Sequence, residues 1–240
     1  MAAAGQETDL PDPKSRLGTV EEIKDGLRFY SAGEFERAVT AYRGAVASNP
    51  RSLDAWEYLG RSLTALARHE EALAAWRQAF KLSGSTHLAL AEAQTLMALA
   101  RPEEALERLR RQIAVDPDDQ RLPLLEARTL ATLGRFDEAL AGAETALRLA
   151  PDSADALYLR GAIRIGRRQL TEAERDLRRA LEIAPGHTAA MSDLAMLLQH
   201  RGDLAGARAL LERVLSLNPE DTNAARHLEN LRRGAATPSG

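Results

Sequence analysis

The chain has 240 residues, enough for one or two domains with a buried core. Ala and Leu dominate its apolar residues whereas Val and Ile are scarce, a composition that favours helices over sheets. The formal charge of −3 gives no general attraction to nucleic acid or anionic membrane, and the lack of cysteine excludes disulfides, thiolate nucleophiles and zinc–thiolate sites.

The two ends of the chain differ from the rest. Residues 1–18 and 234–240 are rich in Ala, Gly, Pro, Ser and charge without periodicity, so we expect disordered tails there. The N-terminus has neither a basic segment nor an apolar one of signal-peptide type, and no apolar stretch approaches the length of a membrane span. As written, the chain is expected to be cytoplasmic.

Between the tails the sequence repeats with a period of about 34 residues. The first unit carries Ala38, Tyr42, Ala45 and Pro50, and a small residue, Gly26, lies twelve positions before Ala38. The same pattern returns in five further units, which begin their second halves at Ala72, Ala105, Ala139, Ala173 and Ala207. Both halves of each unit therefore follow the same period.

Each unit is predicted to fold as two short amphipathic helices. Ala55, Leu59 and Leu63 are spaced to form one apolar stripe, and the second half of each unit forms another. Turns between the two helices are marked by Gly33, by Arg101-Pro102, by Gly134 and by Gly202. Small residues recur where antiparallel helices approach closely.

The pattern resembles the tetratricopeptide repeat, whose signature is most complete at Trp56, Leu59, Gly60, Ala72, Trp76 and Ala79. Gln112 and Val214 depart from it, because they occupy positions that are usually small. The resemblance implies an all-α, right-handed α-solenoid of six helix-turn-helix repeats at residues 19–52, 53–85, 86–119, 120–153, 154–187 and 188–221. Residues 222–233 are then a C-terminal capping helix, with Ala225, Leu228 and Leu231 facing inward.

The resemblance also implies a partner-binding groove on the concave side, lined by the first helix of each repeat. The partner-binding residues expected from these positions are Tyr58, Arg61, Leu90, Gln94, Met97, Leu124, Arg128, Tyr158, Ala162 and Met196. Several are apolar, and exposed contiguous apolar area usually marks binding. The alternative interpretation is that Leu90, Leu124 and Ile165 only pack between neighbouring first helices.

Catalytic patterns are not found among the titratable residues. His69 precedes two glutamates but lacks the second histidine of a metalloprotease motif, and the run of Asp116, Asp118 and Asp119 lacks the glycine and final glutamate of a calcium loop. A half-buried packing histidine and a helix cap are the predicted roles. We therefore expect no enzyme, no cofactor and no metal.

Arginine greatly outnumbers lysine, and six arginines cluster in the fifth repeat: Arg164, Arg167, Arg168, Arg175, Arg178 and Arg179. They alternate at helical spacing with Glu172, Glu174, Asp176 and Glu182. This pattern favours a solvated, salt-bridged face over a site for phosphate or an anionic polymer.

The leading hypothesis is a non-catalytic scaffold that binds a peptide or helix of a partner protein in the concave groove, with no nucleic-acid or membrane partner. Two alternatives stay open. The stretch DLPDPKSR resembles the linker before the repeat tail of some bacterial sulfatase-like hydrolases, so the chain is alternatively the accessory tail of such an enzyme, and extracytoplasmic if the enzyme is exported. The third hypothesis is an RNA-binding solenoid. The oligomeric state is left open.

Overall fold

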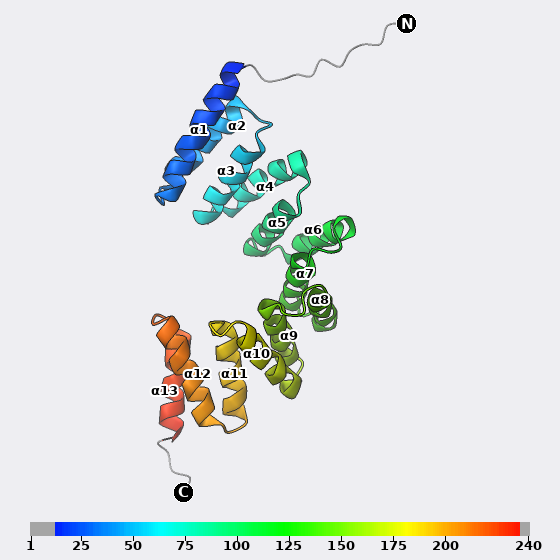
Figure 1. Ribbon diagram of the computed structural model, residues 1–240, viewed down its shortest axis with the longest axis vertical. Helices are drawn as coiled ribbons and strands as arrows, with labels where there is room; N and C mark the ends of the chain where they lie inside the picture. Colours follow the sequence, from blue (N-terminus) through cyan, green and yellow to red (C-terminus); the bar gives the residue numbers. More distant parts are fainter. Residues whose placement is uncertain (1–12, 236–240) are drawn as a thin grey trace. The chain divides into compact units, whose positions relative to one another are not determined.

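The computed structural model describes the backbone of residues 13–235 and the side chains of residues 19–231. Within this range it contains thirteen α-helices and no strand (Figure 1), which confirms the all-α prediction. The chain divides into an N-terminal unit that ends at Gln112 and a C-terminal unit that begins at Ile113.

The N-terminal unit holds five complete helices and most of a sixth. Their bounds are α1 (Pro13–Ser31), α2 (Phe35–Ser48), α3 (Leu53–Ala65), α4 (His69–Ser83), α5 (Thr86–Ala98) and α6 (Pro102–Val115). α1 packs on α2 and α3 on α4 as antiparallel pairs, while α2 contacts α3 and α4 contacts α5. Consecutive hairpins therefore stack on one another within this unit.

The C-terminal unit repeats this arrangement. Its helices are α7 (Arg121–Thr132), α8 (Phe136–Leu149), α9 (Ala154–Gly166), α10 (Leu170–Ile183), α11 (Thr188–His200), α12 (Leu204–Leu217) and α13 (Thr222–Ala235). The pairs α7/α8, α9/α10 and α11/α12 form hairpins, and each second helix contacts the first helix that follows it, with α13 packed against α12.

The first and last helices extend into the residues expected to be tails. Helix α1 begins at Pro13 and α13 continues to Ala235, so residues 13–18 and 234–235 are helical. The rest of both predicted tails, residues 1–12 and 236–240, lies outside the described residues. The resemblance of the N-terminal stretch to a sulfatase linker stays a prediction.

All six hairpin turns have the same backbone geometry. Each has one residue with positive φ: glycine in three turns, but Ala67 (55°), Ala100 (56°) and Arg168 (60°) in the other three. The next N–H donates to the carbonyl five residues earlier, as in Arg68 N to Leu63 O at 2.9 Å. This is the Schellman motif, which satisfies carbonyls at the end of the first helix.

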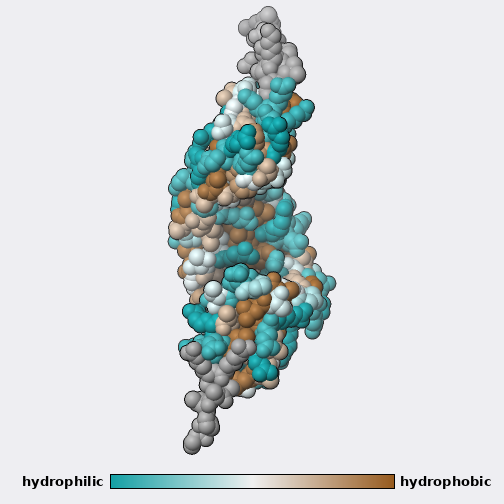
Figure 2. Space-filling view, turned by 90° about the vertical axis from the view of Figure 1, so that its left-hand side faces the viewer, coloured by the Kyte–Doolittle hydropathy of each residue, from teal (hydrophilic) through white to brown (hydrophobic). Residues whose placement is uncertain are grey.

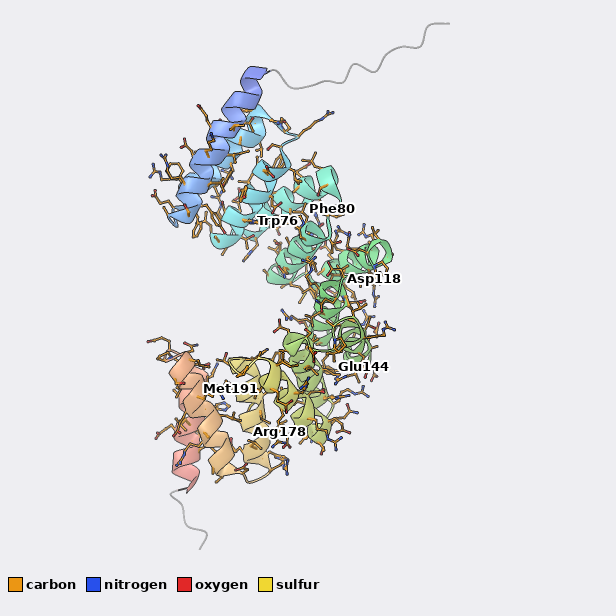
Figure 3. The ribbon with its side chains drawn as sticks, viewed as in Figure 1. Trp76, Phe80, Asp118, Glu144, Arg178 and Met191 are labelled. Carbon is orange, nitrogen blue, oxygen red and sulfur yellow. The ribbon has the colours of Figure 1, made fainter. Side chains whose placement is uncertain are left out.

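The recurring small residues are required by close packing inside each hairpin. A Cβ built at Gly26 would lie 2.5 Å from the ring of Tyr42, and one at Gly60 would lie 2.8 Å from the ring of Trp76. Trp76 is labelled on α4 in Figure 3. The small residue of one helix therefore receives the large residue of its partner, as the sequence pattern predicts.

Gln112 is explained by a buried polar network rather than by close packing. Arg108 donates from Nε to Glu92 Oε2 at 2.8 Å, and Gln112 donates to the hydroxyl of Thr86 at 3.1 Å. Arg77 donates to the second oxygen of Glu92 at 2.9 Å. The network joins α4, α5 and α6, so Gln112 fills its small-residue position with hydrogen bonds that need a longer side chain.

The capping helix buries Leu228 and Leu231 as expected, but it buries Ala224 in place of Ala225. Ala224, Leu228 and Leu231 are buried against the C-terminal core, whereas Ala225 is exposed, so the prediction that Ala225 faces inward was wrong. Ala224, Leu228 and Leu231 follow the spacing of four and three residues that places side chains on one helical face.

Candidate partner-binding surface

The first helices of neighbouring hairpins contact one another within each unit. In the C-terminal unit α7 contacts α9, and α9 contacts α11; in the N-terminal unit α1 contacts α3. The faces of these helices that remain exposed therefore lie side by side. Figure 2 shows apolar surface, in brown, among hydrophilic atoms in the lower part of the view, which belongs to the C-terminal unit.

Five of the expected binding residues lie in the N-terminal unit: Tyr58, Arg61, Leu90, Gln94 and Met97. Arg61 and Gln94 are exposed, and Met97 is half-buried. The placement of Leu90 on the exposed surface was wrong, because it is only 8% exposed. Burial of a leucine side chain is favoured by the hydrophobic effect, so Leu90 contributes to packing rather than to the exposed surface.

Tyr58 and Arg61 are held by neighbours of their own unit. The ring of Tyr58 stacks on Tyr42 with 5.5 Å between centroids, and the guanidinium of Arg61 lies 5.4 Å from the Tyr58 ring. Arg61 also forms a salt bridge with Glu57 at 2.5 Å. The Tyr58 ring and the Arg61 guanidinium therefore already have partners within their own unit.

The other five expected residues lie in the C-terminal unit: Leu124, Arg128, Tyr158, Ala162 and Met196. Leu124 and Tyr158 are half-buried and pack against the core, so each shows only part of its side chain. Arg128 is exposed and has no salt bridge within residues 19–231, and Met196 is 40% exposed. A surface with apolar and cationic elements therefore extends from α7 to α11.

A cavity of about 310 Å³ continues this surface between α11 and α13. Asp193 and Met196 line it from α11, Ala224 and His227 line it from α13, and Leu211 of α12 also contributes. Asp193 is not among the residues predicted from the sequence. It occupies the sixth position of the sixth repeat, which is the position that placed Tyr58 on the surface in the second repeat, so the same rule would have found it.

The carboxyl group of Asp193 is poorly compensated. Burial raises its pKa, and the nearby His187 opposes the shift. Burial also raises the pKa of Tyr158, the charge of Asp193 adds to that shift, and the charge of Arg128 opposes it. The ring of His187 lies 4.7 Å from that of Tyr158. The surface thus carries a cation on α7, an aromatic ring on α9 and an anion on α11.

His187 has a structural role that accounts for its orientation. Its Nδ1 accepts a hydrogen bond from the backbone N–H of Ala190 at 3.1 Å and caps α11. Its Nε2 lies 3.4 Å from an oxygen of Asp155. The imidazole is therefore held at the edge of the surface beside Tyr158.

The arginine-rich repeat differs from the solvated face that its sequence pattern predicts. Glu174 and Asp176 are buried, with exposures of 3% and 4%. Asp176 accepts hydrogen bonds from Arg160 and Arg164 at 2.6 Å. Glu174 forms ion pairs with Arg178 (Figure 3) and with Arg201, the residue that follows α11. These two carboxylates therefore link α10 to the neighbouring hairpin elements instead of lying on a solvated face.

The remaining chemical candidates also have local roles. Asp119 accepts a hydrogen bond from the backbone N–H of Arg121 at 2.9 Å and pairs with the Arg121 guanidinium. These contacts stabilise the turn at the start of α7. His69 is half-buried at the start of α4. Across residues 19–231 no group of three or more acidic or histidine side chains is arranged to hold a metal ion. None of the helices described is long and apolar enough to span a membrane.

Stacked antiparallel helix pairs that expose their first helices define the class of helical-hairpin repeat proteins. Models of the tetratricopeptide repeat match residues 164–231 and, with a second model, residues 24–84, 90–140 and 124–188. The chain belongs to the tetratricopeptide repeat family, and this fold is typical of scaffolds for protein–protein interaction.

One curated relative, the peroxisomal targeting signal receptor of Candida glabrata, is 38% identical over 60 residues. The match covers 25% of this chain, and the chain spans only 10% of the receptor. A tetratricopeptide repeat protein from Parabacteroides merdae is similar in structure, with a TM-score of 0.75 at 18% identity over 91% of this chain and 87% of the other. YrrB, a TPR protein with an unusual peptide-binding site, has a TM-score of 0.57 at 24% identity over 72% of this chain and 90% of YrrB. These structures show the fold alone.

Proposed function

We propose that the chain is a non-catalytic scaffold whose C-terminal unit binds an extended or helical segment of a partner protein along α7, α9 and α11. The observation that carries the proposal is the exposed side chain of Met196, which lines a cavity together with Asp193, whose charge acts on Tyr158 of the adjoining first helix α9. Packing of the hairpins does not require an exposed methionine there. A flexible thioether adapts to apolar side chains of a ligand.

A protein partner suits this surface better than nucleic acid. The arginines of the fifth repeat are largely engaged with carboxylates, as Arg160 and Arg164 are with Asp176. Arg128 and the Tyr158 ring offer one cation and one aromatic side chain, whereas nucleic-acid binding normally uses a basic groove with several stacking rings. YrrB is a precedent for peptide binding on this fold.

The test uses the full chain, immobilised and exposed to a phage-displayed library of random twelve-residue peptides. Peptides enriched by the wild type are then measured by titration. The double variant Arg128→Ala/Met196→Ser should weaken their binding by about 100-fold, because it removes a charge-assisted hydrogen bond and an apolar contact.

The matched control is Arg148→Ala/Leu217→Ser, which removes the same two kinds of side chain from exposed positions of α8 and α12. It should bind as the wild type does. Circular dichroism and melting temperature should be unchanged in both variants. Equal binding by the wild type and the Arg128/Met196 variant would refute this surface as the binding site.

A further inference from the structure

The cavity between α11 and α13 combines apolar walls with a single uncompensated carboxylate. Met196, Leu211 and Ala224 supply the apolar part of its lining, and Asp193 supplies the charge. With a volume of about 310 Å³ it is at the lower end of the range for pockets that bind small ligands, about 300 to 1,000 Å³. The space suits one long side chain better than a folded partner domain.

The other polar groups of the cavity are already engaged or neutral. Asp221 accepts a hydrogen bond from the N–H of Ala224 at 2.9 Å and so caps α13. This carboxylate also offsets the positive end of the α13 dipole, which would otherwise favour an anion in the cavity. No lysine or arginine belongs to the lining residues. Apart from His227, the titratable side chains that line the cavity are therefore the carboxylates of Asp193 and Asp221.

Asp193 has no hydrogen-bond or salt-bridge partner in the described part of the chain, and its only nearby counter-charge is His187 when protonated. A half-buried carboxylate without a partner costs stability, and such groups are normally paired. The other buried carboxylates of this unit, Glu174 and Asp176, each have arginine partners. Asp193 differs from them in facing a cavity that is open to a ligand.

We infer that this cavity is a specificity pocket for a cationic side chain, lysine or arginine, of the polypeptide bound on the adjoining surface. The carboxylate of Asp193 pairs with the ammonium or guanidinium group, and Met196 and Ala224 contact the aliphatic part of the same side chain. This inference rests on the proposed function and extends it by naming a residue type that the bound segment must contain.

The experiment selects the same twelve-residue phage library on the full-length wild type, on Asp193→Asn and on Asp118→Asn. Asp118 lies in the exposed loop before α7 (Figure 3), so its variant removes an equal charge from the same unit outside the pocket. The wild type and Asp118→Asn should enrich peptides with Lys or Arg at one fixed position. Asp193→Asn should lose that preference and bind the best basic peptide about 10- to 100-fold more weakly.

A second measurement is independent of peptide selection. Titration of the wild type with butylguanidinium, followed by amide NMR, should shift the resonances of Ser192, Asp193, Ala224 and His227, and Asp193→Asn should abolish the shifts. Butyrate should cause none. Shifts with butyrate in place of butylguanidinium would overturn the inference and indicate an anion site.

The selection separates the two proposals. Enriched peptides without a basic preference, or a basic preference that Asp193→Asn retains, overturn the pocket assignment and leave the binding surface standing. Failure of all three proteins to enrich any peptide overturns the proposed function and the pocket together.

Discussion

Replacing Ala67, Ala100 and Arg168 with glycine should stabilise the protein. Each has a left-handed backbone in a hairpin turn, with φ of 55°, 56° and 60°. For a residue with a Cβ this conformation costs about 1–2 kcal/mol, and the greater unfolded-state entropy of glycine takes back about 0.5–1 kcal/mol. The net gain is about 0.5–1 kcal/mol per turn, or about 2 kcal/mol for the triple variant.

Three turns of the same geometry already contain glycine, and they isolate the conformational effect. A Cβ built at Gly33, Gly134 or Gly202 would meet no atom within 4 Å. The preference for glycine there is therefore a matter of φ and not of space. Gly134→Ala should accordingly destabilise by about 1 kcal/mol.

Urea denaturation followed by circular dichroism measures both effects, with Ala74→Gly as the control. Ala74 is exposed inside α4, where glycine costs about 1 kcal/mol, so the same substitution should have the opposite sign. A triple-glycine variant that unfolds at the same or lower urea concentration than the wild type would refute the reasoning.

Three further predictions concern buried groups. The hydroxyl of Tyr42 is buried with no hydrogen-bond partner in the described residues, and burial raises the pKa of Tyr42 to about 12, so Tyr42→Phe should raise the free energy of unfolding by about 1 kcal/mol in urea denaturation. Gly60→Ala should lower the free energy of unfolding by about 1–2 kcal/mol, measured by calorimetry, because the new Cβ would lie 2.8 Å from Trp76. In Gly161→Ala the new Cβ would lie 3.2 Å from Leu177, so this variant should lose less stability or gain some. Burial raises the pKa of Asp193, so the folded state holds that proton to higher pH than the unfolded state does, and stability is lost as the pH rises through the folded pKa. The melting temperature of Asp193→Asn should therefore lie above that of the wild type at pH 7 and converge with it toward pH 3. A difference in melting temperature that stays constant with pH would contradict the assignment.

The hairpin pattern could be predicted from the sequence because it depends on local spacing. Gly60 and Trp76 are separated by a fixed number of residues and meet across one turn, so their pairing follows from the repeat. The geometry of the turns at Ala67 and Arg168 was not evident in the same way, since neither residue favours positive φ. There the hydrogen bonds and packing of the hairpin override local preference.

The polar contacts were less predictable because they depend on side-chain direction between helices. Helical spacing predicts that Asp176 alternates with arginines, but not that it turns inward between Arg160 and Arg164. The difference between Ala224 and Ala225 is one step of about 100° around the helix. That step decides which alanine contacts the core and therefore which residues border the cavity near Asp193.

Helix α13 both shields the last hairpin from water and forms a wall of the cavity beside Asp193. Shortening the protein after α12 would consequently expose the apolar face of the last hairpin and remove one wall of the proposed pocket at once. The identity of Ala224 is thus subject to two demands, because the same side chain is buried in the core and lines the cavity.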